Sequence, residues 1–381
     1  MKISDIKVYK VKPRWIFVKV LTDEGITGWG EMISGTKTET VVAGAYEMGK
    51  KLIGRDPFEI ERLWQEMHRS FFRGGPINGT IISGLEMALW DIKGKALNLP
   101  VYELLGGAAR DRIRVYSWIG GDRPSDVAEQ AQARVDKGFT AIKMNATSEL
   151  HYIDSYNKVQ AVVDRVASIR DQVGDQLEIG IDFHGRVHRP MAKVLAHALE
   201  PYHPMFLEEV VLPENWDSFD DIAREVSIPL ATGERLYTRW DFKNLFRQGA
   251  IDIVQPDVAL CGGILETRKI AAMAEAFDMA VAPHAPYGPG SLAATLQVDA
   301  CTPNVFIQEQ SLGIHYNRGF DLLDFVKNKE IFQYKDSYVQ LPKGPGLGID
   351  MDEDKIKEVA QEGLVWSNPS WKNYDGTIAE W

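Results

Sequence analysis

The strongest constraint on the fold is an alternation of short apolar segments with amphipathic ones, which begins near residue 113. Apolar segments with the length of strands occupy residues 113–118, 140–145, 177–183, 205–209, 228–234, 251–257, 279–284 and 304–310. The segments between them, such as PSDVAEQAQARVDKG and GILETRKIAAMAEAF, have the apolar spacing and the length of helical crossovers. Eight strands with helices between them predict an α/β fold, the (β/α)8 barrel.

The first 112 residues have a different organisation, in which strands precede a run of helices. The segments KISDIKVYKVK, WIFVKVLTD and ITGWGEM have the pattern of an antiparallel meander, and three segments with helical periodicity follow. This order predicts an α+β domain over residues 1–112, followed by a barrel domain over residues 113–319.

The remaining segment, residues 320–381, is polar and mixed. It carries Trp366, Trp371 and Trp381, and tryptophan is unusual in a disordered tail. We therefore expect this segment to fold back onto the first domain, with a partner-binding tail as the alternative.

The composition excludes several classes of function. Lys and Arg number 43 against 54 Asp and Glu, so the formal net charge of −11 argues against nucleic acid or an anionic membrane as the principal partner. Two cysteines, Cys261 and Cys301, cannot form a disulfide framework. No apolar run approaches the roughly 18 residues of a membrane helix, and the alternating first residues do not resemble a signal peptide. We expect a cytoplasmic protein, plausibly a homo-oligomer, with a small-molecule partner.

Ionisable side chains at the ends of the predicted strands indicate where the chemistry lies. At intervals of about 25 residues, roughly one βα unit, the strands end in or near Asp182, Glu208, Glu234, Asp257, His284 and Glu309. Active sites of barrel enzymes lie at this C-terminal end of the strands. One such residue alone would more often be a solvated loop charge. A series on six consecutive strands predicts a shared site, and its acidic crowding calls for a cation.

Three of these carboxylates form a candidate metal site. Asp182, Glu208 and Glu234 follow three adjacent strands, so their side chains can converge on one point. Ligation by oxygen alone favours Mg²⁺ over zinc, which prefers His and Cys ligands.

Two histidines are candidates for proton transfer. His184 lies two residues after Asp182, on the same side of its strand. His284 ends the seventh strand, four positions from the third strand in an eight-strand ring, so the two rings should face each other. Asp257, on the sixth strand, could hold one ring nitrogen of His284 and raise its basicity.

The motifs Lys143-x-Asn145 and Asp182-x-His184, with the acidic residues and His284 that follow, resemble the enolase superfamily, in its mandelate racemase subgroup. The resemblance also includes PRWIFVKV, FRGGP, ALWDIKGK, YSWIGGDRP, GIDFHGRV, QEQSLGIHYN, LLDFVKNKE and the final AEW, and so spans nearly the whole chain. It implies a modified TIM barrel, an N-terminal capping domain completed by the C-terminal segment, and one Mg²⁺ per subunit held by the three carboxylates.

The resemblance also implies a role for each residue of the site. His284, paired with Asp257, would take the proton from C2 of a sugar acid, and His184 would protonate the departing 3-hydroxyl. Glu309 would hydrogen-bond the carboxylate as it becomes an enediolate, and Lys143 would add positive charge there. The product would be a 2-dehydro-3-deoxy sugar acid, which makes the chain a hydro-lyase.

Several alternatives stay open. D-galactonate is the first candidate substrate, and a gluconate-type acid or an L-sugar acid is the alternative. A metal-dependent hydrolase would need a His-x-His pair at the end of the first strand, which YSWIGG lacks. A non-catalytic scaffold would be expected to have lost at least one residue of the predicted site, and none is missing.

The sequence departs from the family pattern at two positions. Asn145 stands where mandelate racemases carry a second Lys, which disfavours racemisation and favours elimination in one direction. Val210 replaces the Pro of a Glu-Glu-Pro motif after the fourth strand, which could loosen that loop.

Substrate specificity is the least determined property. Loops of the capping domain are expected to contact the distal end of the substrate, and the candidate residues there are Arg14, Trp15, Phe72, Arg73 and Asn78. We predict Arg14 and Arg73, together with Asn145, as substrate-binding residues. The alternative for both arginines is that they merely join the two domains, and Trp15 could be plain interface packing.

Overall fold

The computed structural model describes residues 1–380 except 34, 36, 71, 72, 123, 318 and 365. The candidate Phe72 and the last tryptophan, Trp381, therefore lie outside the described residues.

The N-terminal residues form an antiparallel sheet covered by helices, as predicted. Its strands are β1 (Ile3–Val11), β2 (Trp15–Thr22) and β3 (Thr27–Ile33), with β2 in the middle. The helices that follow are α1 (Thr38–Gly49), α2 (Ile60–Arg69), α3 (Pro76–Leu97) and α4 (Val101–Leu104). Helix α3 packs directly on β3, where a Cβ at Gly28 or Gly30 would overlap carbonyl oxygens of the helix.

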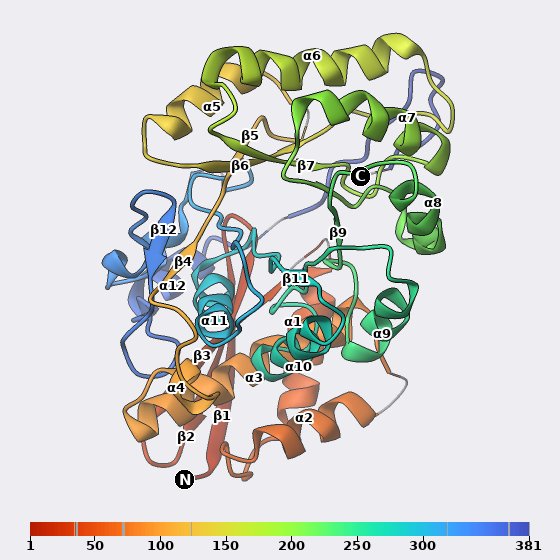
Figure 1. The fold of residues 1–381 in the computed structure, drawn as a ribbon. Coiled ribbons are helices and arrows are strands. Elements are labelled where there is room, and N and C mark those ends of the chain that lie inside the picture. The colour runs from red at the N-terminus through yellow and green to blue at the C-terminus, as the bar shows by residue number, and fades with distance from the viewer. Residues whose placement is uncertain are drawn as a thin grey trace.

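A parallel sheet forms the barrel, with strand order β11-β10-β9-β8-β7-β6-β5 (Figure 1). Its strands are β5 (Ser117–Ile119), β6 (Ala141–Asn145), β7 (Glu178–Asp182), β8 (Phe206–Glu208), β9 (Leu230–Thr232), β10 (Ile253–Val254) and β11 (Ala280–Val281). Residues 304–310 provide the eighth position through isolated parallel bridges, Val281 to Val305 and Val115 to Gln308. These bridges close the ring, so the predicted barrel is confirmed.

Helices connect the strands on the outside of the barrel. They are α5 (Val127–Val135), α6 (Tyr156–Val173), α7 (Arg189–Leu199), α8 (Phe219–Ala223), α9 (Arg239–Gln248), α10 (Ile264–Glu275) and α11 (Pro289–Ala300). Because helices cover the outer face and side chains fill the interior, strand residues such as Ile142, Ile179 and Leu207 are fully buried.

The predicted first barrel strand, residues 113–118, is two separate strands. Strand β4 (Arg112–Arg114) pairs with β12 (Tyr338–Gln340) in an antiparallel ladder, and β5 enters the barrel after it. The prediction treated one apolar run as one strand, and no local pattern indicated a partner more than 200 residues away.

Two buried carboxylates of the N-terminal region dock on the barrel. Glu86 of α3 accepts hydrogen bonds from the backbone N–H groups of Ile264 and Leu265, at 2.7 and 2.9 Å, at the start of α10. Glu31 of β3 accepts from Gly288, Gly290 and Ser291 at the start of α11. Each carboxylate thus satisfies free donors at a helix N-terminus, where negative charge is favoured.

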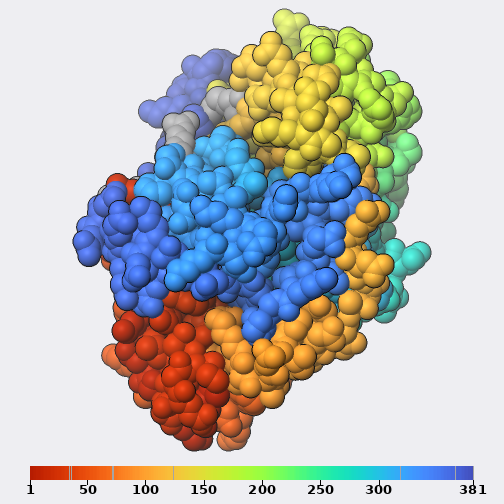
Figure 2. All heavy atoms as spheres, turned by 90° about the vertical axis from the view of Figure 1, so that its left-hand side faces the viewer, coloured from red at the N-terminus to blue at the C-terminus, as the bar shows by residue number. Residues whose placement is uncertain are grey.

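The C-terminal segment returns to the first domain only in part. Helix α12 (Glu353–Ala360) lies on β1, and Glu353 of this helix pairs with Lys19 at 2.7 Å. In Figure 2 the blue C-terminal third lies between the red N-terminal strands and the yellow helices of the barrel.

The end of this segment takes a path that the sequence did not predict. The ring of Tyr374 meets that of His151, in the loop after β6, at 4.7 Å between centroids. The last residues thus reach loops at the C-terminal ends of barrel strands, whereas Trp366 still lies against Arg14 of the first domain. The boundaries at residues 112 and 319 stay predictions.

Two further expectations concern membranes and cysteines. Within the described residues, no helix is both long enough and apolar enough to cross a membrane. Cys261 and Cys301 are buried free thiols.

Candidate active site

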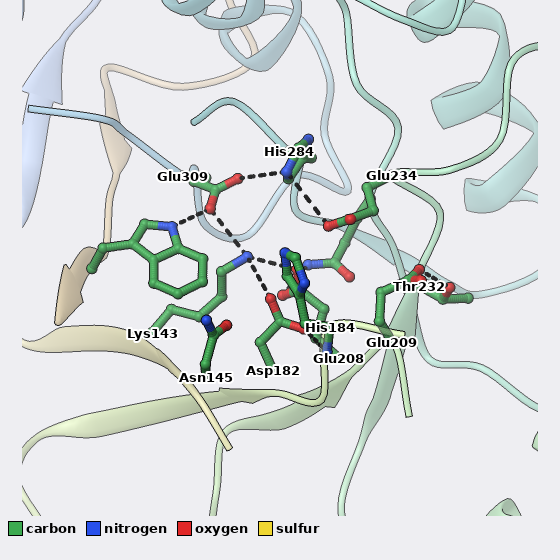
Figure 3. A network of polar contacts seen from close by, with 12 residues as sticks. Lys143, Asn145, Asp182, His184, Glu208, Glu209, Thr232, Glu234, His284 and Glu309 are labelled. Carbon is green, nitrogen blue, oxygen red and sulfur yellow. Dashed lines mark hydrogen bonds and ion pairs between the residues drawn. The ribbon is translucent and has the colours of Figure 1, made fainter. Parts of the chain in front are cut away.

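Three carboxylates converge at the C-terminal ends of neighbouring barrel strands. Asp182 ends β7, Glu208 ends β8, and Glu234 follows β9 by two residues. One ligand atom from each lies within 4.8 Å of the other two, as the close view in Figure 3 allows the reader to follow. The structure therefore brings together the three residues predicted as metal ligands.

The surroundings of this acidic triad fit a divalent cation. Asp182 Oδ1 accepts from the backbone N–H of His184 at 2.6 Å, whereas the buried Oδ2 has no hydrogen-bond partner among the residues that the structure describes. Burial and the neighbouring Glu208 raise the pKa of Asp182 well above its usual range. A cation would remove both costs, since it binds the orphan oxygen and offsets the repulsion between carboxylates.

Lys143 lies among the same carboxylates. Its ammonium is 2.6 Å from Glu208 Oε1, 3.1 Å from Glu309 Oε1 and 4.0 Å from Asp182 Oδ2. Burial opposes the charged form, but the negative neighbours outweigh it and raise the pKa of Lys143 well above its usual value. The side chain is therefore a fixed buried positive charge beside the triad.

His284 is oriented by an acidic partner. Asp257 Oδ2 lies 2.7 Å from His284 Nδ1, and Nε2 faces Glu234 at 3.4 Å. An Asp acceptor keeps a hydrogen on Nδ1, so the proton that the ring gains or loses is on Nε2. Burial lowers the pKa of His284, but Glu234, Glu309 and Asp257 raise it to about 10. A cation on Glu234 would act against that rise.

His184 has the opposite kind of partner. Arg186 Nη2 lies 3.1 Å from His184 Nδ1, and a guanidinium can only donate, so Nδ1 accepts and Nε2 carries the hydrogen. Arg235 donates to the His184 carbonyl at 2.7 Å. The residue has a φ of +56°, a left-handed conformation that is strained for a side chain of this kind.

The two rings belong to strands four positions apart, since His184 follows β7 and His284 follows β11. Both point into the same cluster of side chains in Figure 3. The expectation that they share one site is met by this placement.

Glu309 is held as an acceptor. Its Oε1 accepts from the indole N–H of Trp118, and its Oε2 accepts from the backbone N–H of Ala285 at 2.8 Å. Burial raises its pKa, but Lys143 and His284 outweigh burial and lower it. The hydrogen bond from Glu309 to the substrate carboxylate, which the family resemblance implied, stays a prediction.

Asn145 lies beside Lys143 at the end of β6. Its Nδ2 donates to the carbonyl of Gly121 at 3.3 Å, while its buried Oδ1 finds no hydrogen-bond partner in the described part of the chain. That oxygen is available to accept from a substrate hydroxyl.

Val210 lies in a loop that is packed and hydrogen-bonded. The Glu209 N–H donates to Ala231 at 3.0 Å, and the Glu209 carbonyl accepts from Gly185 at 3.0 Å. The side chain of Val210 is fully buried. A looser loop in the absence of proline stays a prediction.

The candidate specificity residues of the first domain separate into two groups. Arg14 reaches the barrel: it donates to the Pro286 carbonyl and lies over the ring of Tyr287 at 5.2 Å. The Tyr287 ring in turn packs edge-on against His284. Trp15 is fully buried against Phe325 inside the first domain, so it cannot contact a substrate.

Arg73 and Asn78 are not brought to the triad in the part of the chain that the structure describes. Arg73 is exposed, and its charge acts on His68. Asn78 approaches only the Gly74 carbonyl, at 3.5 Å. The geometry gives neither residue a contact with the site.

Four residues of the site were not predicted as site residues from the sequence: Trp118, Arg186, Arg235 and Gln255. Each orients a residue that the sequence did predict; Gln255, for example, donates to Glu208 Oε2 at 2.7 Å. The available signal was their position, since all four lie at or just after the ends of barrel strands.

Comparisons with known families match both parts of the chain. The model "Mandelate racemase / muconate lactonizing enzyme, N-terminal domain" matches residues 8–106, and the model "Enolase C-terminal domain-like" matches residues 126–355.

Full-length relatives are also found. The chain is 50% identical to D-galactonate dehydratases of Variovorax paradoxus (strain S110) and Ralstonia pickettii (strain 12J), each over 100% of both chains. Among solved structures, an enolase from Agrobacterium radiobacter, described as a candidate galactarate dehydratase with bound Na and L-malate, has a TM-score of 0.89 and 34% identity over 100% of both chains. A candidate dehydratase from Mesorhizobium loti has a TM-score of 0.88 and 32% identity, covering 96% of this chain and 99% of the other.

Proposed function

Because the chain belongs to the enolase superfamily, in its mandelate racemase subgroup, we propose that it converts D-galactonate to 2-dehydro-3-deoxy-D-galactonate and water, with one Mg²⁺ per subunit. The full-length dehydratase relatives support a hydro-lyase that acts on a sugar acid. The identity of the sugar acid, the metal and the residue roles are the further parts of the proposal.

One observation supports the proposal most strongly: two histidines with opposite Nδ1 partners share one site with a buried acidic triad. Dehydration of a sugar acid needs this combination, because a proton must leave C2 and a hydroxide must leave C3. A racemase would need a base on each face of C2, and the second lysine of racemases is absent at Asn145.

The difficult step is removal of the C2 proton, since it places a second negative charge on the carboxyl group. Only groups that bind this charged form better than the substrate accelerate the step. Mg²⁺, when bound by Asp182, Glu208 and Glu234, would supply Lewis-acid stabilisation of that charge. The Lys143 ammonium adds a fixed positive charge at the same place, and its hydrogen bonds to Glu208 and Glu309 hold it there.

The proton acceptor in this proposal is Nε2 of His284. Asp257 holds the ring through Nδ1 and stabilises the imidazolium that forms when Nε2 takes the C2 proton. Glu309, as an ionised acceptor, supports the same imidazolium, because its Oε2 lies 3.8 Å from Nε2.

The proton donor is Nε2 of His184, which carries the hydrogen because Nδ1 accepts from Arg186. Hydroxide is a poor leaving group, so donation to the 3-hydroxyl oxygen is required as the C3–O bond breaks. The enol that results becomes the 2-keto acid.

A panel of sugar acids tests the proposal. Metal-loaded protein should convert D-galactonate to a 2-keto acid that reacts with semicarbazide. Faster conversion of a gluconate-type or L-sugar acid would move the same mechanism to that substrate. No keto acid from any member of the panel would disprove the dehydratase proposal.

A further inference from the structure

A pocket of about 480 Å³ lies beside the candidate active site, and its lining residues belong neither to the acidic triad nor to the histidine pair. Three separate parts of the chain form its wall: the turn between β1 and β2, loops after barrel strands, and the C-terminal tail. The lining residues that matter here are Lys12, Asp122, His315, Tyr316, Trp366 and Trp371.

One side of the pocket is linked to His184 and Asn145. Asp122 lies in the loop after β5, and its carbonyl accepts from Arg186 at 3.0 Å. Arg186 is also the residue that contacts His184 Nδ1. The preceding carbonyl, of Gly121, accepts from Asn145. Arg186 therefore connects Asp122 to His184, and the neighbouring Gly121 connects it to Asn145.

The other side of the pocket is linked to His284. The Arg14 guanidinium lies over the rings of Tyr316, Trp366 and Tyr287, at 4.6, 5.8 and 5.2 Å. The Tyr287 ring packs against that of His284 at 5.7 Å. The pocket thus adjoins residues on both sides of the site, where the end of a bound sugar acid remote from its carboxylate would extend.

The lining suits a polyol. Aromatic side chains supply apolar walls, and Asp122 supplies a strong acceptor for hydroxyl groups. Its Oδ1 accepts from the Tyr316 hydroxyl and lies 3.6 Å from His315 Nε2. Within the described residues these contacts involve Oδ1, which leaves Oδ2 able to accept from a ligand hydroxyl.

The charge of Asp122 bears on which acids can bind. Burial would raise its pKa, but the nearby His315 and Arg186 and the hydrogen bond from Tyr316 outweigh burial and lower it, so the carboxylate is ionised. Of the cations nearby, Lys12 is already paired with Glu362 at 3.0 Å, and Arg14 and Arg186 donate to the carbonyls of Pro286 and Asp122. A second carboxylate on the ligand would meet the fixed negative charge of Asp122.

We propose that this pocket receives the distal end of the sugar acid, and that Asp122 makes it selective for a neutral terminal hydroxyl over a second carboxylate. The inference rests on the proposed function, because it assumes that the substrate carboxyl group lies at the acidic triad. It assigns to Asp122 the discrimination between an aldonic acid, such as galactonate, and the matching aldaric acid, galactarate.

Asp122→Asn tests the proposal, because it removes the charge while keeping the size of the side chain. The measurement is the ratio of kcat/KM for D-galactonate to kcat/KM for galactarate. This ratio should fall at least about tenfold in the variant. Tenfold corresponds to a repulsion between the two carboxylates of roughly one pKa unit. A folded Asp122→Asn enzyme whose ratio stays within about twofold of the wild-type ratio would overturn the proposal.

Asp175→Asn is the matched control, since it makes the same change at a 91% exposed carboxylate after α6, outside the pocket lining. Its ratio should stay within about twofold of the wild-type value. A shift as large as that of Asp122→Asn would show that the net charge of the chain, and not Asp122, decides the preference. If Asp122→Asn does not fold, as judged by circular dichroism, Asp122→Ser replaces it with the same expected outcome.

A binding measurement separates failure of this inference from failure of the proposed function. Calorimetric titration of Mg²⁺-loaded His284→Asn, with and without Asp122→Asn, gives the ratio of the Kd values of both acids without turnover, because the base is absent. A tenfold change in that ratio supports the pocket even if the wild type dehydrates neither acid, in which case only the proposed reaction fails. An unchanged Kd ratio, where the wild type does dehydrate galactonate, refutes the pocket alone.

Discussion

His184 and His284 carry the same imidazole ring, but the residue that contacts Nδ1 differs between them. Arg186 donates to Nδ1 of His184, whereas Asp257 accepts from Nδ1 of His284. Nε2 of His184 therefore carries a hydrogen that it can donate, whereas Nε2 of His284 can accept a proton. Neighbouring side chains therefore separate the two roles.

Replacing each histidine by Asn should separate the two half-reactions. His284→Asn should abolish both dehydration of D-galactonate and exchange of its C2 hydrogen in D₂O, because both need the base. His184→Asn should lower dehydration by about 10²–10⁴-fold but retain exchange, because only loss of the 3-hydroxyl needs the acid. Proton NMR follows the exchange, and semicarbazide follows the keto acid.

If His284→Asn retained the exchange and His184→Asn abolished it, His184 would be the base and His284 the acid. His197→Asn is the control, since this histidine is exposed on α7 and should leave both rates unchanged. Loss of both rates in His184→Asn, with the fold intact, would contradict its role as the acid.

Removal of the metal should weaken the fold as well as stop the reaction. Without a cation, the buried Asp182 and Glu208 and the partly buried Glu234 repel one another. Addition of Mg²⁺ to EDTA-treated protein at about 100 times Kd should stabilise the folded state by about 2.7 kcal/mol. A thermal denaturation series against Mg²⁺ concentration measures this gain.

Asp182→Asn provides the comparison for the metal prediction. The amide keeps the shape of the side chain but removes one charged ligand, so the Mg²⁺-dependent rise in Tm should shrink and shift to higher concentrations. An equal rise in both proteins would indicate that Mg²⁺ stabilises the chain at another place.

At the scale of single residues, the sequence was sufficient for those that carry charge at strand ends. Asp182, Glu208 and Glu234 could be predicted because the βα period places them at one level of the barrel. Trp118 and Arg186 could not, because their roles depend on which atom they touch. Glu309 shows the same limit: its acceptor state follows from Trp118 and Lys143, which are distant in sequence.

Among the elements, α10 and α11 depend on carboxylates from the first domain for their N-terminal hydrogen bonds. Glu86 receives the donors of α10 and the indole N–H of Trp90, at 2.7 Å. Burial raises the pKa of Glu86 to about 8, although the hydrogen bonds act to lower it.

This raised pKa predicts a dependence of stability on pH. The ordinary pKa of a Glu is about 4.5, so between pH 4.5 and 8 the folded chain binds a proton that the unfolded chain has released. Stability from Glu86 is therefore complete below about pH 4.5 and is lost as pH rises toward 8. The loss is on the order of 1 kcal/mol per pH unit.

Glu86→Gln should flatten that part of the stability curve, because the amide keeps an acceptor oxygen and does not titrate. Urea unfolding at pH 5, 6, 7 and 8 measures the slope for both proteins. Glu275→Gln, an exposed position on α10, should keep the wild-type slope. Equal slopes in wild type and Glu86→Gln would show that Glu86 stays ionised in the folded protein.

The elements themselves were predicted in type and order, but less well in extent. The segment 251–257 was predicted as a strand, and only Ile253–Val254 forms one before Pro256 interrupts the ladder. The split of residues 113–118 into β4 and β5 was missed, since β4 exists only because β12 returns to pair with it.

For the whole molecule, the two-part architecture could be predicted because each part has its own periodicity. The way the parts meet could not. The docking of Glu31 and Glu86 on helix N-termini joins residues nearly 180 or more positions apart. The path of the tail was also beyond local pattern, because Tyr374 and Asp375 reach His151 and Lys158 through ring and charge contacts rather than through an apolar stripe.

Removal of the tail after Leu364 tests its role in the whole molecule. The tail carries Trp366 and Trp371 of the pocket, whereas β12 and α12, which pack on the first domain, stay in place. Residues Tyr374 and Ile378 are 85% and 70% exposed, so little of the core is lost and Tm should stay within about 4 °C.

KM of the shortened chain for D-galactonate should rise at least about tenfold, because two aromatic walls of the pocket beside Asp122 are gone. Exchange of the C2 hydrogen at saturating substrate should persist, since no described residue of the acidic triad or the histidine pair belongs to the tail. Steady-state kinetics with a circular dichroism melt measures both effects. An unchanged KM in the shortened chain would mean that the tail covers a surface that the substrate does not reach.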